Sequence, residues 1–80
     1  MFTVYILKSQ KNPTKHYVGI TTNLPNRLIE HNHGKSIYTK KYCPWMIETF
    51  ITFNNEELAK NFERYLKTGS GYSFLKRHLF

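Results

Sequence analysis

Three stretches of the chain are rich in β-branched and aromatic residues, as β-strands are. They cover residues 2–8, 16–21 and 45–53. Alternation divides the first stretch between two faces, one with Phe2, Val4 and Ile6 and the other with Thr3, Tyr5 and Leu7. A polar segment with an Asn12-Pro13 turn signal separates the first two stretches, which predicts a hairpin. The third stretch is apolar on nearly both faces, which predicts a central or doubly covered strand.

A first helix is predicted after the hairpin. Asn23 can cap a helix that runs to about Asn32, and Gly34 is suited to end it. Leu24 and Leu28 define the stripe that this helix buries.

Two polar side chains lie on the shoulder of that stripe. Arg27 and His31 are spaced i,i+4, so both are expected to point past the edge of the core toward the sheet. Gly19 lacks a side chain in the middle of the second strand, which often marks a bulge or the close approach of a ligand or another backbone.

A second helix is predicted to begin at Asn54, where Glu57 completes a pattern like a capping box, and to end at Gly69. Its apolar residues follow helical spacing: Leu58, Ala59, Phe62, Tyr65 and Leu66. Glu63 lies at the margin of this apolar stripe.

The remaining segments complete the predicted order ββαβαα. Residues 35–44 are interpreted as an irregular loop, and a short last helix is predicted over about residues 72–79. The expected fold class is α/β in the broad sense and α+β in detail, with a small three-stranded, mainly antiparallel sheet flanked by helices. Eighty residues suffice for one small domain and not for two, so residues 1–80 are expected to form a single domain.

Charge and cysteine content narrow the functional classes. Twelve Lys and Arg against five Asp and Glu give a net charge of +7, which favours a polyanionic partner such as nucleic acid. The single cysteine, Cys43, excludes an intramolecular disulfide and a Cys-based zinc cluster. No signal-peptide pattern or membrane-spanning apolar stretch is found, so a soluble, cytoplasmic protein is expected.

Two short motifs and three single residues stand in a distinctive order. T-V-Y at residues 3–5 and Y-V-G at 17–19 are followed by Arg27, His31 and Glu63. On these elements and in this order, they resemble the GIY-YIG nuclease family, with T-V-Y in place of G-I-Y and Y-V-G in place of Y-I-G. The resemblance covers essentially all 80 residues and is strongest to small members that consist of this one domain.

The resemblance implies roles for the five residues. Glu63 would bind one divalent ion, Mg²⁺ or Mn²⁺, as a Lewis acid, and Arg27 would hold the scissile phosphate. Of the two tyrosines, one would deprotonate water and the other would orient it. An unperturbed phenol has a pKa near 10, so the base needs a proton acceptor. The favoured assignment is Tyr5 as base, His31 as relay and Tyr17 as positioning residue; the tyrosines could exchange roles.

Two sets of basic residues are predicted to bind nucleic acid. Lys35, Lys40 and Lys41 alternate with Tyr38 and Tyr42, as a segment that follows a nucleic-acid strand would. Lys67, Lys76 and Arg77 form the second set. Contacts of this kind give affinity without sequence preference, and the alternative is a simply solvated basic surface.

The sequence therefore predicts a metal-dependent DNA endonuclease of low sequence specificity in DNA repair or recombination. Selectivity for DNA structure is compatible with this prediction. RNA is not excluded as a substrate, a protein partner could supply specificity, and a monomer or weak dimer is expected. The alternative is a catalytically weak nucleic-acid-binding module, or an adaptor that recruits another nuclease. Two departures from the family support that alternative: Thr3 replaces the first glycine, and no counterpart of a C-terminal asparagine follows Glu63.

Overall fold

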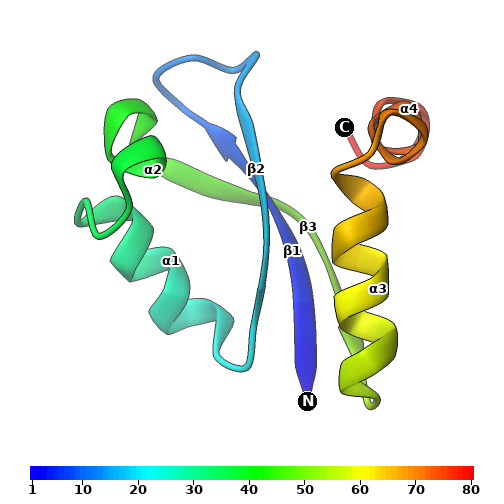
Figure 1. Ribbon diagram of the computed structural model, residues 1–80. Coiled ribbons are helices and arrows are strands. Elements are labelled where there is room, and N and C mark those ends of the chain that lie inside the picture. The colour runs from blue at the N-terminus through cyan, green and yellow to red at the C-terminus, as the bar shows by residue number, and fades with distance from the viewer.

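Three antiparallel strands form one sheet in the computed structural model, which describes all of residues 1–80. The strands are β1 (Phe2–Ser9), β2 (His16–Thr21) and β3 (Trp45–Phe53), in the order β2-β1-β3 (Figure 1). β1 and β2 form the predicted hairpin, in which Tyr5 stands opposite Gly19. The α+β class with a three-stranded antiparallel sheet is confirmed.

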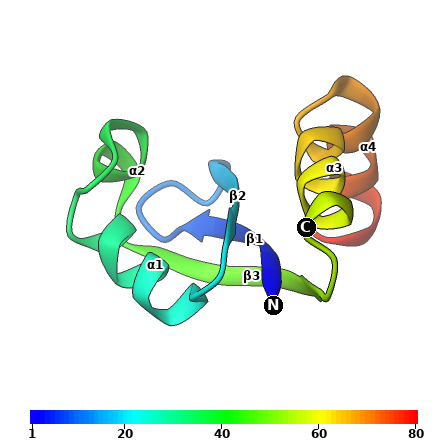
Figure 2. The same cartoon turned by 60° about the horizontal axis from the view of Figure 1, so that its bottom comes forward.

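Helices cover both faces of this sheet. α1 (Leu24–Asn32) and α2 (Ile37–Tyr42) lie on one side, and α3 (Glu56–Leu66) and α4 (Gly69–His78) lie on the other (Figure 1 and Figure 2). None of the four is long and apolar enough to cross a membrane.

The middle strand supplies the core on both sides, and its residues are divided between the two faces as alternation predicts. Val4 and Ile6 pack against residues of α3 and α4, namely Ala59, Leu66 and Leu75. Tyr5 and Leu7 point to the opposite face, where they pack with Trp45 and the two leucines of α1. Both faces of β1 are buried because helices cover both sides of the sheet.

β3 lies at the edge of the sheet, so the prediction of a central strand is wrong. The alternative prediction, a strand covered on both faces, explains its apolar composition, because α1 contacts one face of β3 and α3 contacts the other. Trp45 is buried on the α1 side, and Phe53 packs on the α3 side. Local sequence reports how a strand is covered, whereas its place in the sheet depends on long-range pairing.

Residues 35–44 are not the irregular loop that was predicted, because α2 lies within them. The element order is therefore ββααβαα rather than ββαβαα. α2 buries Thr39, whereas Ile37 is 93% exposed. A buried threonine beside an exposed isoleucine reverses the usual apolar signal, which is why periodicity does not reveal this helix.

The ends of α3 and α4 also differ from the predictions. Asn55 caps α3, accepting a hydrogen bond on Oδ1 from the Leu58 N–H at 3.0 Å, so the predicted cap at Asn54 is wrong by one residue. α3 ends at Leu66, and Gly69 begins α4 instead of ending α3. The Thr68 hydroxyl caps α4, which therefore starts earlier than predicted.

Part of the predicted apolar stripe on α3 is not buried. Ala59 and Leu66 are buried and Phe62 is half-buried, but Leu58 and Tyr65 are exposed. Only one face of α3 meets the sheet, so helical spacing overestimates the width of the buried stripe.

Candidate active site

Tyr5 on β1 lies close against Gly19 on β2. The two residues are cross-strand partners, and a Cβ added at Gly19 would overlap the hydroxyl oxygen and Cζ of Tyr5. The Tyr5 ring therefore lies across the glycine, and any side chain there would displace it. Gly19 marks a close approach, but the group that approaches is the Tyr5 phenol and not the ligand or backbone that was predicted.

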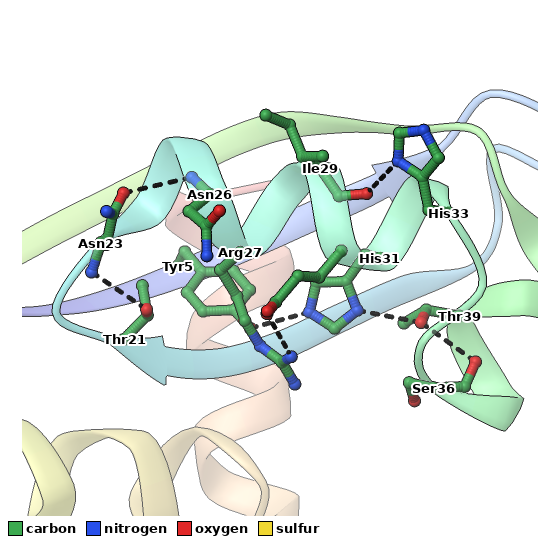
Figure 3. Close-up of polar contacts among 11 residues, drawn as sticks. Tyr5, Thr21, Asn23, Asn26, Arg27, Ile29, His31, His33, Ser36 and Thr39 are labelled. Carbon is green, nitrogen blue, oxygen red and sulfur yellow. Dashed lines mark hydrogen bonds and ion pairs between the residues drawn. The ribbon is translucent and has the colours of Figure 1, made fainter.

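Tyr5 is the first of three side chains in a buried hydrogen-bonded chain. Its hydroxyl lies 2.9 Å from Nε2 of His31, and the Nδ1 of His31 lies 2.9 Å from Oγ1 of Thr39 (Figure 3). Tyr5 is 1% exposed, and His31 and Thr39 are both 0% exposed. His31 was expected on the shoulder of α1, but α2 covers it and completes its burial.

The direction of these hydrogen bonds follows from the last link. The Thr39 hydroxyl donates to the Ser36 carbonyl oxygen at 3.3 Å, because a carbonyl can only accept. Thr39 therefore accepts from Nδ1–H of His31, which leaves Nε2 with a free lone pair. The Tyr5 O–H consequently donates to Nε2, and the imidazole is set to receive the tyrosine proton.

The electrostatics of the pair agree with this direction. Burial raises the pKa of Tyr5, and the nearby Arg27 guanidinium opposes that rise. Burial also lowers the pKa of His31, and the positive charge of Arg27 lowers it further. At neutral pH the phenol is thus protonated and the imidazole neutral, which are the states that a proton relay requires.

Arg27 extends from α1 beside the Tyr5 ring, in the direction that its helical position predicts (Figure 3). One of its terminal nitrogens donates to Oε1 of Glu30 at 2.9 Å. This hydrogen bond is the main reason that the pKa of Arg27 is raised, and the proximity of Tyr5 contributes. Only a third of the Arg27 side chain is exposed, so its fork of donors is held near the phenol.

Tyr17 lies in the same aromatic group as the relay. Its ring centroid is 4.8 Å from that of His31 and 6.2 Å from that of Tyr5. Both tyrosines point to the α1 face of the sheet, because Tyr17 stands opposite Leu7. The structure therefore brings together the two tyrosines, the histidine and the arginine.

Glu63 lies on α3, which packs on the opposite side of the sheet from α1. Burial is the main cause of the raised pKa of Tyr5, and the negative charge of Glu63 makes a minor contribution. The side chain is only 14% exposed and forms an ion pair with Lys67 one turn later. No cluster of three or more His, Cys, Asp or Glu side chains is arranged around a common point that could hold a metal.

A family model of the GIY-YIG catalytic domain matches residues 1–73. The chain belongs to the GIY-YIG family. It is 33% identical over 85 residues to the structure-specific endonuclease subunit SLX1 of Debaryomyces hansenii, across 98% of this chain but 23% of that protein. The chain thus spans about a quarter of the length of that relative.

Two bacterial relatives are nearer in size. A UPF0213 protein of Pediococcus pentosaceus is 35% identical over 81 residues, which cover 96% of this chain and 83% of the relative. The UPF0213 protein SH2523 of Staphylococcus haemolyticus is 36% identical over 74 residues, which cover 91% and 88%. The GIY-YIG identification made from the motifs is therefore confirmed, and with it membership of a nuclease family.

The predicted basic residues of this GIY-YIG chain lie in separate places. Lys40 and Lys41 are in the last turn of α2, and Lys35 lies just before it. Lys76 and Arg77 are in the last turn of α4. The side chains of all five residues are exposed. Lys67 is also exposed, but it is paired with Glu63 instead of joining Lys76 and Arg77.

The sequence analysis did not identify the roles of three further residues near the site. Thr39 orients His31 from within a helix that was not predicted, Glu30 pairs with Arg27, and Lys67 pairs with Glu63. The last two pairs are spaced i,i+3 and i,i+4 on helices, so helical charge patterning could have revealed them.

Proposed function

We propose that this protein is an endonuclease that hydrolyses DNA phosphodiester bonds, with residues 1–80 acting as one nuclease domain. The observation that carries the proposal is the buried relay from Tyr5 to His31, with the Arg27 guanidinium beside the phenol. Hydrolysis of a phosphodiester needs an activated water, an oriented phosphate and compensation of the charge that develops on it. Each requirement has a residue in this arrangement.

In the proposed reaction, Tyr5 accepts a proton from the attacking water while its own proton passes to Nε2 of His31. Thr39 remains the acceptor for Nδ1–H, so the imidazolium keeps its orientation. Tyr17 orients the water or the phosphate from the neighbouring strand. The exchanged assignment of the tyrosines is less favourable, because Tyr5 is the one whose hydroxyl contacts His31.

Arg27 binds the phosphate. Its guanidinium already holds the carboxylate of Glu30, and a phosphate oxygen offers the same acceptor geometry with more charge. Exchange of Glu30 for the phosphate, or sharing between them, would compensate charge where it grows during attack.

Glu63 would hold one divalent ion, Mg²⁺ or Mn²⁺. The donor set fits such an ion, because Mg²⁺ takes one or two protein carboxylates and completes its shell with water and phosphate oxygens. Bound there, the ion would supply Lewis acidity toward the phosphate and the leaving oxygen. Lys67 must release Glu63 first.

The substrate and setting are proposed on broader grounds. The net charge of +7 supports binding to a polyanion through residues at the ends of α2 and α4: Lys35, Lys40, Lys41, Lys76 and Arg77. Such contacts give low sequence specificity. The Debaryomyces hansenii relative is named as a structure-specific endonuclease subunit, which supports selectivity for DNA structure and a partner subunit. A role in DNA repair or recombination is also part of the proposal. A cytoplasmic location is part of the proposal.

The test is incubation of the purified protein with single-stranded, branched and supercoiled DNA, with and without Mg²⁺ or Mn²⁺. We expect metal-dependent cutting that Glu63→Gln and Arg27→Ala each reduce by at least about a hundredfold. Glu56→Gln is the matched control, since that glutamate is exposed on the same helix and pairs with Lys60. Cutting that survives Glu63→Gln or Arg27→Ala would show that the assignment is wrong.

One observation favours a rival function. Glu63 is neutralised by Lys67, which is the state expected in a nucleic-acid-binding module that does not cut. That module would bind DNA with strong salt dependence and show no metal-dependent cleavage, so the same assay separates the two functions.

A further inference from the structure

A pocket of about 400 Å³ opens beside the free edge of β2. Its lining residues come from β2, α2, the end of α3, α4 and Phe80. In Figure 1, β2 lies between α2 and α4. Its walls are mostly aromatic, and the rings that matter here are Tyr17, Tyr38, Tyr72 and Phe80. The aliphatic side chains of Leu66 and Leu75 also line the pocket.

The pocket shares two residues with the candidate active site. Tyr17 lines it and also packs against His31, and Lys67 lines it while paired with Glu63. One ligand could therefore place one group in the pocket and a second group, joined to the first by a short linker, at the relay. A nucleotide has this form, with a flat ring at one end and a phosphate at the other.

We propose that the pocket holds one unpaired nucleobase of the strand being cut. The inference rests on the proposed function and extends it from a phosphate site to a base site. Every base has a flat π-face, so stacking on tyrosine and phenylalanine accepts any of them without reading sequence. The lining is mainly apolar, which suits a ring better than a phosphate.

Packing between neighbouring rings fixes the positions of two of the aromatic side chains that line the pocket. Phe80 is stacked on His16 with centroids 3.7 Å apart, and Tyr72 meets the edge of Phe80 at 6.2 Å. The charges complement the phosphates on either side of the base, since Lys67 lines the pocket and the Lys76 amine lies 5.8 Å from the Tyr72 ring.

The consequence is selectivity for unpaired nucleotides. A base within a duplex is stacked and paired, and removing it costs a few kcal/mol, whereas a base in a single strand, flap or mismatch is already available. The enzyme should therefore cut next to unpaired nucleotides in preference to continuous duplex.

The test compares two chains of equal charge: a single-stranded oligothymidylate and an abasic deoxyribose-phosphate chain of the same length. Binding is measured in chelator, so that neither chain is cut. Wild-type protein should bind the base-bearing chain about fivefold to a hundredfold more tightly. Tyr72→Ala should lose most of that preference while keeping its affinity for the abasic chain and its dependence on salt.

Tyr65→Ala is the matched control, because Tyr65 is 41% exposed, Tyr72 is 54% exposed, and only Tyr72 lines the pocket. The control should retain the full preference for bases. The exposure of Tyr72 means that its replacement should leave the fold intact, and the unchanged affinity for the abasic chain checks this. A fluorescent adenine analogue in the strand should also be quenched on binding to wild type and not to Tyr72→Ala.

Equal binding of both chains by wild-type protein, or equal loss of preference in both variants, would overturn the base site. Cleavage activity is a separate readout. If DNA is cut without any base preference, the proposed nuclease stands and the base site fails. If a Tyr72-dependent base preference is found without cutting under any condition, the base site stands and the proposed nuclease fails.

Discussion

The phenol oxygen of Tyr5 and Nε2 of His31 lie 2.9 Å apart, although the two residues are 26 positions apart in sequence. The pair joins the central strand to the first helix, and α2 covers it through Thr39. The same contact therefore belongs to the core of the domain and to its proposed chemistry. Substitutions here need controls that separate the two contributions.

His31→Ala should reduce cleavage by about a hundredfold to ten-thousandfold, because Tyr5 loses its proton acceptor. The measurement is kcat on a single-stranded or branched DNA substrate. His33→Ala is the control, since His33 is exposed at the C-terminal end of α1 and its Nδ1–H donates only to the Ile29 carbonyl. Equal activity of the two variants would remove His31 from the mechanism.

Thr39→Val should lower kcat by about tenfold to a hundredfold with little change in KM, because His31 loses the group that fixes its tautomer. Thr39→Ser keeps the hydroxyl and should restore activity. Nitrogen chemical shifts of the imidazole, measured by NMR, should show Nδ1–H in wild type and in Thr39→Ser, and a mixture of tautomers in Thr39→Val. A single unchanged tautomer in all three would contradict the positioning role.

Gly19→Ala should displace the Tyr5 ring, since the added methyl group overlaps the phenol. We expect the free energy of unfolding to fall by about 1–3 kcal/mol, measured in urea, and cleavage to fall further than stability explains. Gly69→Ala provides the comparison, because a Cβ there meets nothing within 4 Å. That variant should be as stable as wild type or slightly more stable. Similar losses in both would indicate a general cost of alanine.

The strands and most helices could be predicted from sequence because their signals are local. Alternation in β1 correctly divided its residues between two faces, and Asn23 was correctly placed as the α1 cap. The position of β3 in the sheet and the existence of α2 could not be predicted, since the first depends on long-range pairing and the second inverts the usual burial pattern at Ile37 and Thr39.

The sequence was sufficient to predict which residues belong to the candidate site. It was not sufficient to predict how these residues are arranged in space. Tyr5, Arg27 and His31 are brought together as expected, but the full burial of His31 depends on α2. The partner that sets its tautomer lies eight residues later in that unpredicted helix. The roles of these residues stay predictions until activity is measured.

Folding stability should decrease as the pH falls below about 6.5, the ordinary pKa of histidine. Burial lowers the pKa of His31 and of His16, so between their folded and unfolded pKa values the unfolded chain binds more protons. The free energy of unfolding must then rise with pH through this window, by at most about 1.4 kcal/mol per pH unit for each histidine. Above this window, the two histidines should no longer make it depend on pH. Urea titrations from about pH 7.5 to about pH 5 measure this.

His16→Gln should flatten that slope, because it removes one of the two groups, and His33→Gln should leave the slope unchanged. A slope of equal size in His16→Gln would assign the effect to His31 alone. Stability that is constant or rises on acidification would contradict the low pKa of both histidines.

Lys67→Gln should strengthen binding of Mn²⁺ to the free protein, by up to about fivefold, because it removes the cation that competes for Glu63. Measuring Mn²⁺ binding without DNA, by paramagnetic resonance, separates this effect from the contribution of Lys67 to phosphate or pocket contacts. Lys60→Gln is the matched control, since Lys60 forms the equivalent i,i+4 pair with Glu56 on the exposed face of α3. Glu63→Gln should abolish the binding that Lys67→Gln strengthens. If Lys67→Gln and Lys60→Gln bind Mn²⁺ alike, the ion does not use Glu63, and the metal proposal fails at its only carboxylate.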